Sequence, residues 1–194
     1  ADDRVLQPGD IVSIDVGMEW PVEDEHQHII NPHSKHGGYI TDTAFSKIIG
    51  ENNNEDKENL LKTTQRALYA AIDQARVGNT VADIGKKVEE IVEPEGFGIV
   101  KRLCGHGVGH EVHEEPNVFN FYTEQGEQQE LKEGVVIAIE PMLTQGGNPE
   151  VTTGENEWSI VTEDGGSAGH FEHTVIVEPD GPTVATKRPG EDIG

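Results

Sequence analysis

Apolar residues alternate with more polar ones over residues 11–17, directly after a Pro-Gly-Asp turn signal. The same period-two pattern returns over residues 39–45. Successive side chains on a strand point to opposite faces, so this pattern predicts two β-strands. If the two strands pair antiparallel, Asp15 and Asp42 lie close together.

Two further segments have apolar residues at spacings of three and four, which is the period of a helix buried along one side. The first segment spans residues 56–76, and Gly78 ends it. The second begins at Thr80 with a weak capping-box pattern and stops at Pro94. We therefore expect two successive helices after the paired strands.

Short apolar runs separated by turns make up the rest of the chain. Strands are predicted at residues 97–102, 135–140, 157–162 and 171–177, and the polar, Gly-rich stretch 143–156 is predicted to be a loop. A β-hairpin, two helices and then several antiparallel strands indicate an α+β fold, an antiparallel sheet with flanking helices.

No internal repeat or linker divides the sequence, so we expect a single domain over residues 1–194. Residues 18–38 lack any period and are predicted to form a loop, and residues 186–194 are predicted to form a flexible tail. The chain opens with Ala-Asp-Asp-Arg and has no initiator Met, which suggests a piece of a longer protein.

The charge of the chain limits its partners. There are 37 acidic and 14 basic residues, and the formal net charge is −23. Such a charge repels a phosphate backbone, so we expect no nucleic-acid partner, whereas a cationic group such as a free peptide N-terminus would be attracted. A solvated acidic surface is the simplest cause of the excess.

The sequence gives no sign of a membrane segment or of disulfide bonding. No apolar run is long enough to span a bilayer, and no secretory signal precedes the first strand. Cys104 is the single cysteine, so no internal disulfide can form. We expect a cytoplasmic protein without membrane contact.

Four carboxylates and one histidine stand at the ends of strand-like runs or in a Gly-rich turn. They are Asp15, Asp42, His106, Glu140 and Glu172. Hard oxygen donors together with one imidazole can hold two divalent ions side by side and bridge them. A pair of such ions makes a strong nucleophile from water at neutral pH, so the set predicts a metal-dependent hydrolase.

The densest stretch of candidates is the Gly- and His-rich segment 104–116. Its glycines let the backbone approach a ligand closely, and its histidines suit metal binding and proton transfer. Glu140 ends a very apolar strand and is costly to bury unless a cation receives it. The alternative for segment 104–116 is a turn with incidental histidines, and the alternative for Glu140 is a carboxylate that emerges into water.

Cys104 has no neighbouring acid to orient a Cys–His pair, so we expect a buried structural thiol rather than a nucleophile.

A set of short motifs closely resembles type I methionine aminopeptidase, in order and in rough spacing, over residues 4–185. The motifs are Ile14-Asp15-Val16-Gly17, Thr41-Asp42-Thr43-Ala44, Cys104-Gly105-His106-Gly107-Val108-Gly109, His113-Glu114-Glu115-Pro116, Ile139-Glu140-Pro141-Met142 and Phe171-Glu172-His173-Thr174.

The resemblance implies a pita-bread fold, in which two pseudo-symmetric halves enclose a site for two metal ions. It also implies an enzyme that removes the N-terminal methionine from nascent polypeptides when the second residue is small. At matching positions, Asp15 and Asp42 would be ligands, and Asp42 would bridge the two ions. His106 and Glu140 would complete the shell of the second ion, and Glu172 would bridge.

The implied mechanism is attack of a metal-bridging hydroxide on the scissile carbonyl carbon. Glu140 would pass the water proton to the leaving amine, and His113 would hydrogen-bond the substrate near that carbonyl. Trp158 and Met142 would belong to the pocket for the methionine side chain. The donor set suits Mn²⁺, Fe²⁺ or Co²⁺, and Zn²⁺ is also compatible. The expected partners are nascent polypeptide N-termini, including those still on the ribosome.

The chain departs from the family pattern in two places. The family has a further N-terminal stretch, which supplies part of the methionine pocket and another proton-handling histidine. A separate N-terminal fragment of the same fold, or a longer precursor, would restore it. The gap between Asp15 and Asp42 is also longer than usual, so residues 18–38 are interpreted as a solvated insertion. Its histidines are His26, His28, His33 and His36, and an extra metal site at the first two is the alternative.

Two rival functions remain open. X-Pro aminopeptidases and prolidases share the fold and the ligand types, but that branch has an arginine two residues before the last glutamate and an acid just after it. Here His170 and His173 occupy those places. The second rival is a non-catalytic pita-bread protein that binds protein or RNA. Such relatives tend to lose ligands, all of which are present here, and the negative charge opposes RNA binding.

Overall fold

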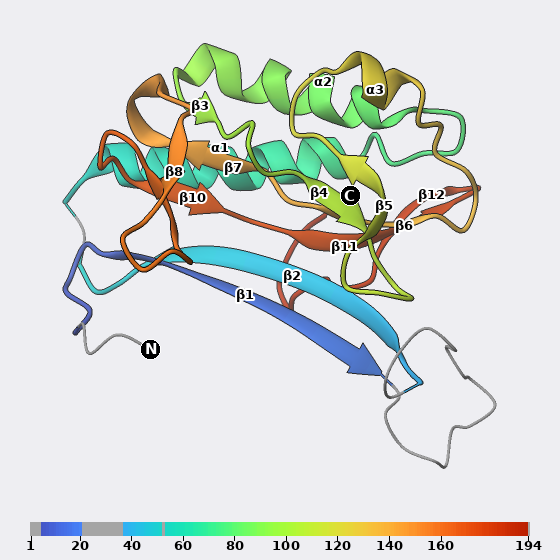
Figure 1. The fold of residues 1–194 in the computed structure, drawn as a ribbon, viewed down its shortest axis with the longest axis horizontal. Coiled ribbons are helices and arrows are strands. Elements are labelled where there is room, and N and C mark those ends of the chain that lie inside the picture. Colours follow the sequence, from blue (N-terminus) through green and yellow to red (C-terminus); the bar gives the residue numbers. More distant parts are fainter. Residues whose placement is uncertain (1–4, 21–36, 52, 194) are drawn as a thin grey trace.

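The structure is a computed structural model that describes residues 5–20, 37–51 and 53–193, and Figure 1 shows how its layers are arranged. The chain begins with strands β1 (Ile11–Trp20) and β2 (Tyr39–Ile48), which precede helices α1 (Glu55–Ile72) and α2 (Val81–Val92). The later strands and helices, in chain order, are η2 (Glu93–Glu95), β3 (Gly98–Ile99), β4 (Gly105–Gly107), β5 (Glu114–Val118), α3 (Glu124–Glu127), β6 (Val136–Ile139), β7 (Met142–Thr144), η3 (Gln145–Gly147), β8 (Val151–Thr153), β9 (Ile160–Thr162), β10 (Ala168–His170), β11 (His173–Glu178) and β12 (Gly181–Val184).

The strands form antiparallel sheets. A five-stranded sheet has the order β12-β11-β6-β4-β5, and a three-stranded sheet has the order β10-β7-β3. Strands β1 and β2 make a separate antiparallel ribbon, and β8 and β9 make a short hairpin. Helices α1 and α2 lie on one side of the sheets and the β1–β2 ribbon lies on the other (Figure 1). The segments that carry His106, Glu140 and Glu172 therefore lie between the helices and the ribbon, which carries Asp15 and Asp42.

The core lies where the apolar stripes of α1 and α2 pack against the sheets. Its fully buried side chains include Leu60, Leu68, Ile72, Ile84, Val88, Ile137, Ile139, Leu143 and Val175. Burying one large aliphatic side chain contributes about 1.5–3 kcal/mol, so this layer holds the sheets rigidly. Asn54 caps the N-terminus of α1, because its side chain accepts hydrogen bonds from the backbone N–H groups of Asp56 and Lys57.

The predicted α+β class and the order of strand pair, helices and further strands are confirmed. The predicted loop at residues 143–156 is wrong in part, because that stretch contains most of β7, the short helix η3 and strand β8. Strand β7 owes its conformation to pairing with β10 and β3, which are distant in the sequence. No helix among the described residues is long and apolar enough to cross a membrane.

Two predictions at irregular segments need correction. The predicted flexible tail at residues 186–194 is packed as far as Ile193, whose side chain is only 8% exposed. The loop predicted at residues 18–38 begins later than expected, because β1 continues to Trp20. The histidines of that loop, His26, His28, His33 and His36, lie outside the described residues.

Candidate metal centre

The β1–β2 ribbon places two of the predicted ligands on one face. Asp15 lies opposite Ala44 and Asp42 lies opposite Gly17, so the two carboxylates are diagonal neighbours across the ribbon. Asp15 is exposed, whereas Asp42 is buried. Burial raises the pKa of Asp42, and the nearby charge of Asp15 raises it further. The sequence-based expectation that these two carboxylates meet is confirmed.

Three buried residues from distant parts of the chain converge beside this ribbon. Asp42, His106 and Glu172 each offer a ligand atom, and these atoms lie within 4.8 Å of one another. Glu140, which follows β6, joins them because its Oε1 lies 3.5 Å from Nε2 of His106. The five residues predicted from the sequence therefore gather in one place, with Asp15 at the exposed edge.

Glycines on either side of His106 fix the position of β4. A Cβ atom on Gly105 would lie 2.2 Å from the carbonyl oxygen of Ala138, and one on Gly107 would lie 2.2 Å from that of Glu115. Neighbouring strands thus leave no space for a side chain at either position. Nδ1 of His106 lies 2.9 Å from the carbonyl oxygen of Gly107, which can only accept, so Nδ1 carries the proton. Nε2, on the side of Glu140, is then left with a lone pair for a metal ion.

Backbone and hydroxyl hydrogen bonds join β2 to β11 next to the ligands. The N–H of Asp42 donates to Oγ1 of Thr174 at 2.8 Å, and the N–H of Glu172 donates to the carbonyl oxygen of Ala44 at 2.8 Å. The hydroxyl of Thr43 donates to the carbonyl oxygen of Glu172, also at 2.8 Å. These bonds fix the spacing between Asp42, which is on β2, and Glu172, which directly precedes β11.

The electrostatics of the cluster call for a cation. Burial raises the pKa of Glu172 most, followed by repulsion from Glu140, Asp42 and Asp15, and together these effects bring it to about 9. A divalent ion would reverse this effect by neutralising the gathered carboxylates. Oxygen donors with one neutral imidazole form a set that divalent transition ions accept. The residues present therefore fit a metal ion.

Two other histidines approach the cluster. The ring of His113 lies 4.3 Å from the ring of His106, measured between centroids, and its side chain is exposed in a pocket of about 360 Å³. Nε2 of His170 lies 3.3 Å from Oε2 of Glu140, although its angles fall outside those of a hydrogen bond. His170 was not predicted as a site residue. The available signal was its position two residues before Glu172, which places both on one face of an extended segment.

The predicted members of the methionine pocket have different surroundings. Met142 lines a mostly apolar cavity of about 240 Å³, and His170 lines the same cavity. Trp158 is 86% exposed and is not among the residues that line it.

Burial raises the pKa of Cys104, and Glu140 and Glu115 raise it further, which keeps the thiol protonated and argues against a nucleophile.

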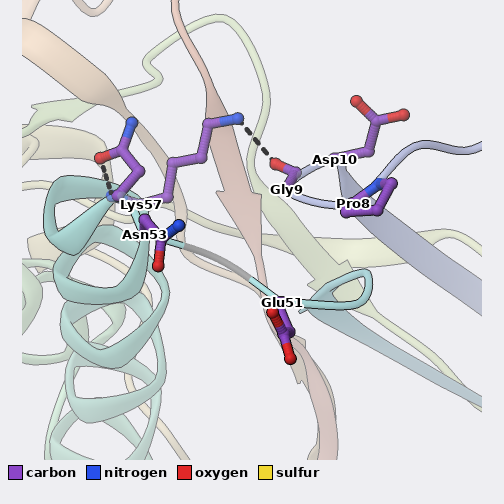
Figure 2. Close-up of a pocket in the computed structure, with 7 residues that line it drawn as sticks. Pro8, Gly9, Asp10, Glu51, Asn53 and Lys57 are labelled. Carbon is purple, nitrogen blue, oxygen red and sulfur yellow. Dashed lines mark hydrogen bonds between the residues drawn. The ribbon is translucent and has the colours of Figure 1, made fainter.

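Another pocket, of about 650 Å³, lies between the turn before β1 and the start of α1 (Figure 2). Figure 2 shows Nζ of Lys57 donating to the carbonyl oxygen of Gly9, a contact of 2.7 Å. None of the predicted site residues lines this pocket. The metal centre therefore remains the best candidate for the functional site.

Comparison with known proteins gives a consistent picture. The profile of metallopeptidase family M24 matches residues 1–179. A methionine aminopeptidase of Aquifex aeolicus is 39% identical over 186 residues, covering 95% of this chain and 65% of that relative. The chain thus spans slightly less than two thirds of that relative's length.

Solved structures agree in fold. A crystal structure of methionine aminopeptidase from Thermotoga maritima aligns with a TM-score of 0.82 and 33% identity, covering 97% of this chain and 68% of that structure. The prolidase of Pyrococcus furiosus aligns with a TM-score of 0.69 and 24% identity, covering 97% of this chain and 44% of that one. The prolidase likeness concerns the fold alone.

Proposed function

Because the chain belongs to metallopeptidase family M24, we propose that it carries the metal site of an aminopeptidase that removes the N-terminal methionine from polypeptides. Membership of this family implies the use of a divalent metal ion. The observation that carries the proposal is the convergence of Asp42, His106 and Glu172, with Glu140 beside His106.

The proposal includes two metal ions per chain. Asp42, His106 and Glu172 bring their ligand atoms within 4.8 Å of one another, Glu140 lies beside His106, and Asp15 is close enough to Asp42 to raise its pKa, so these five residues would hold the ions. Oxygen-rich sites with a single imidazole favour Mn²⁺, Fe²⁺ or Co²⁺, and Zn²⁺ is also compatible. When bound, such ions lower the pKa of water and polarise a carbonyl group.

Two side chains are placed to handle protons and charge. Glu140 has one oxygen 3.5 Å from His106 and the other 3.3 Å from His170, so its carboxylate is held facing the cluster. It would accept a proton from water and deliver it to the leaving amine. His113 stands exposed beside His106 and would donate a hydrogen bond to the scissile carbonyl oxygen.

The surroundings of the site suit an apolar first residue with a free amine. The cavity lined by Met142 has little polar lining and reaches His170, which contacts Glu140. The net charge of −23 attracts a cationic peptide N-terminus. We include in the proposal that the substrates are new polypeptide N-termini, on the ribosome or released, and that the protein acts in the cytoplasm.

The exposed face of β1 supports a proposed partner segment. Ile14, Val16, Met18 and Trp20 alternate along this face and are each about half exposed or more, at 47%, 52%, 61% and 62%. Contiguous apolar surface of this kind marks an interaction site. The partner would be a further part of the same fold, supplied as a separate fragment or by a longer precursor.

A peptide panel tests the proposed activity. The chain, loaded with Mn²⁺ or Co²⁺ and supplied with an N-terminal segment of the fold, should release methionine from Met-Ala-Ser and leave Ala-Pro-Ala intact. Glu140→Gln should abolish the release, while the exposed control Glu133→Gln should not. Cleavage of Ala-Pro-Ala alone would favour an X-Pro peptidase, and cleavage of neither peptide would favour a binding protein.

A further inference from the structure

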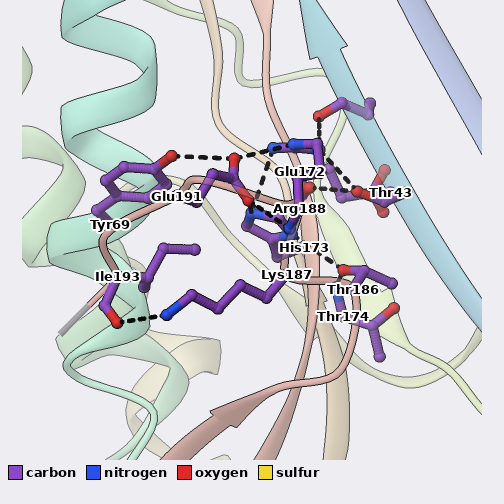
Figure 3. A network of polar contacts seen from close by, with 11 residues as sticks. Thr43, Tyr69, Glu172, His173, Thr174, Thr186, Lys187, Arg188, Glu191 and Ile193 are labelled. Atoms are coloured by element: carbon purple, nitrogen blue, oxygen red, sulfur yellow. Dashed lines mark hydrogen bonds and ion pairs between the residues drawn. The ribbon is translucent and has the colours of Figure 1, made fainter.

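The C-terminal segment 185–193 returns from β12 past β2 and β11, next to the two central carboxylates, Asp42 on β2 and Glu172 directly before β11 (Figure 3). The N–H of Ala185 donates to the carbonyl oxygen of Thr174 at 2.9 Å, and Ile193 is buried at the other end of the segment. Between these two anchors, Arg188 points toward β2 and β11 (Figure 3).

The guanidinium of Arg188 contacts three parts of the molecule at once. Nη1 donates to Oγ1 of Thr43 at 3.0 Å and to the carbonyl oxygen of Ala44 at 3.3 Å, both on β2. Nη2 lies 3.2 Å from Nε2 of His173 on β11. Nε donates to Oε1 of Glu191 at 2.9 Å, within the C-terminal segment itself. A planar guanidinium suits this kind of fixed, forked contact.

The two groups on β2 that accept hydrogen bonds from Arg188 also bond the main chain of Glu172. The hydroxyl of Thr43 donates to the carbonyl oxygen of Glu172, and the carbonyl oxygen of Ala44 accepts from its N–H. Thr43 is also the neighbour of Asp42 in the chain and donates its N–H to Oδ1 of that residue at 3.0 Å. The guanidinium is therefore bonded to Thr43 and Ala44, the two residues of β2 that also bond the main chain of Glu172 and, through Thr43, the carboxylate of Asp42.

Glu191 fixes the guanidinium in turn. Its Oε2 accepts from the N–H of Arg188 at 2.7 Å, and its Oε1 accepts from the hydroxyl of Tyr69 at 3.0 Å. Tyr69 belongs to α1, so this network joins the C-terminal segment to the helical layer as well as to both strands (Figure 3). Long, flexible arginine side chains lose entropy when they are fixed, and this many partners offset that loss.

We propose that Arg188 is a positioning residue for the metal centre: it holds β2 and β11 at the separation that lets Asp42 and Glu172 bind metal ions together. This inference rests on the proposed metal site. It makes the C-terminal segment part of the functional site, although none of its residues reaches the ligand atoms.

If Arg188 acted on the metal ions only through its charge, its loss would change the metal affinity in the opposite direction. A cationic group near a metal site repels the ion, so a loss of positive charge should strengthen metal binding. A positioning role predicts weaker binding whenever the forked contacts are lost. Arg188→Lys keeps the charge and cannot make contacts to Thr43, Ala44, His173 and Glu191 simultaneously, so it separates the two effects.

Calorimetric titration with Mn²⁺ measures the proposed effect directly. We expect Arg188→Lys to weaken metal binding by about 10-fold, the size of effect seen when a partner of a metal ligand is lost. Arg102→Lys is the matched control, because Arg102 bonds Val151 and Thr153 away from the cluster. Its affinity should match that of the parent. The Co²⁺ absorption spectrum should also change in Arg188→Lys and not in the control.

A milder variant guards against unfolding. Glu191→Gln keeps the shape of the anchor and removes its charge, and we expect about 3-fold weaker binding, below the usual range for a direct partner. Equal affinity of the parent and of a folded Arg188→Lys, or of a folded Glu191→Gln if the first variant does not fold, would overturn the inference. Failure of the parent to bind Mn²⁺ would instead overturn the proposed metal site.

Discussion

Glu172 is the residue whose state depends most on the metal ion. It is 1% exposed and is surrounded by other carboxylates, which together with burial raise its pKa to about 9. The metal-free protein therefore keeps this carboxyl protonated at neutral pH, and a bound ion must displace the proton. Titration with Mn²⁺ in two buffers of different ionisation enthalpy should reveal that proton release. Equal apparent enthalpies in both buffers would contradict it.

The same shift makes the stability of the metal-free protein depend on pH. The folded protein retains the proton of Glu172 up to about pH 9, while the unfolded chain loses it near the ordinary value of 4.5. The stabilisation is complete below that lower value and declines as pH rises toward 9, by about 1 kcal/mol per pH unit from this group. Urea unfolding should show a shallower decline in Glu172→Gln. If the free energy of unfolding depended on pH in the same way in the parent and in Glu172→Gln, the raised pKa of Glu172 would be refuted.

In the sequence, His170 served only to distinguish this chain from the prolidase branch, and it was not predicted as a site residue. Its contact with Glu140 suggests that it helps to hold the carboxylate that handles protons. We expect His170→Gln to lower kcat for Met-Ala-Ser by about 10-fold, in the lower range for a group that assists proton transfer. His110→Gln is the control, since His110 contacts Glu114 and Tyr39 instead. Similar kcat values for both variants would argue against the role.

At the scale of elements, strand β4 decides where the imidazole ligand sits. The absence of side chains at Gly105 and Gly107 lets β4 fit closely between β5 and β6. Gly105→Ala should destabilise the protein by about 1–3 kcal/mol, because a methyl group would force the strands apart. Gly154→Ala meets only ordinary contacts and serves as the control. Denaturant unfolding with little difference between the two would contradict this account of β4.

Elements formed by interactions between residues close in the sequence were predictable, and elements formed by contacts between distant residues were not. Helices α1 and α2 were predictable because their apolar stripes and caps are local. Strand β7 and the packing of Arg188 were not, since both depend on partners far away in the sequence. The ligand set was predictable because a carboxylate at the end of an apolar run is costly without a cation, even before its neighbours are known.

At the scale of the whole molecule, the candidate ligands are gathered while, among the described residues, one apolar face of the β1–β2 ribbon is exposed. The apolar face of β1 points away from the sheets, and the chain spans 65% of the length of its Aquifex aeolicus relative. We expect a mixture of the chain with an N-terminal segment of the fold to cleave Met-Ala-Ser faster than the chain alone.

A charge on the apolar face of β1 should prevent the increase in the rate of Met-Ala-Ser cleavage that the N-terminal segment gives. Val16→Lys should lose the increase in rate, because a lysine is costly to bury in an apolar interface, and should still bind Mn²⁺ as the parent does. Thr152→Lys, on the short strand β8, is the matched control and should keep the gain. A rate for the chain alone equal to that of the mixture would show that no covering segment is needed.

The central claim is that Asp42, His106 and Glu172, with Asp15 and Glu140 beside them, form a site for two divalent ions. Calorimetric titration of the chain with Mn²⁺ tests it most directly. We predict two ions per chain with micromolar or tighter affinity, loss of that binding in Asp42→Asn, and no change in the exposed control Asp180→Asn. Absence of binding in the parent, or equal binding in Asp42→Asn, would contradict the claim.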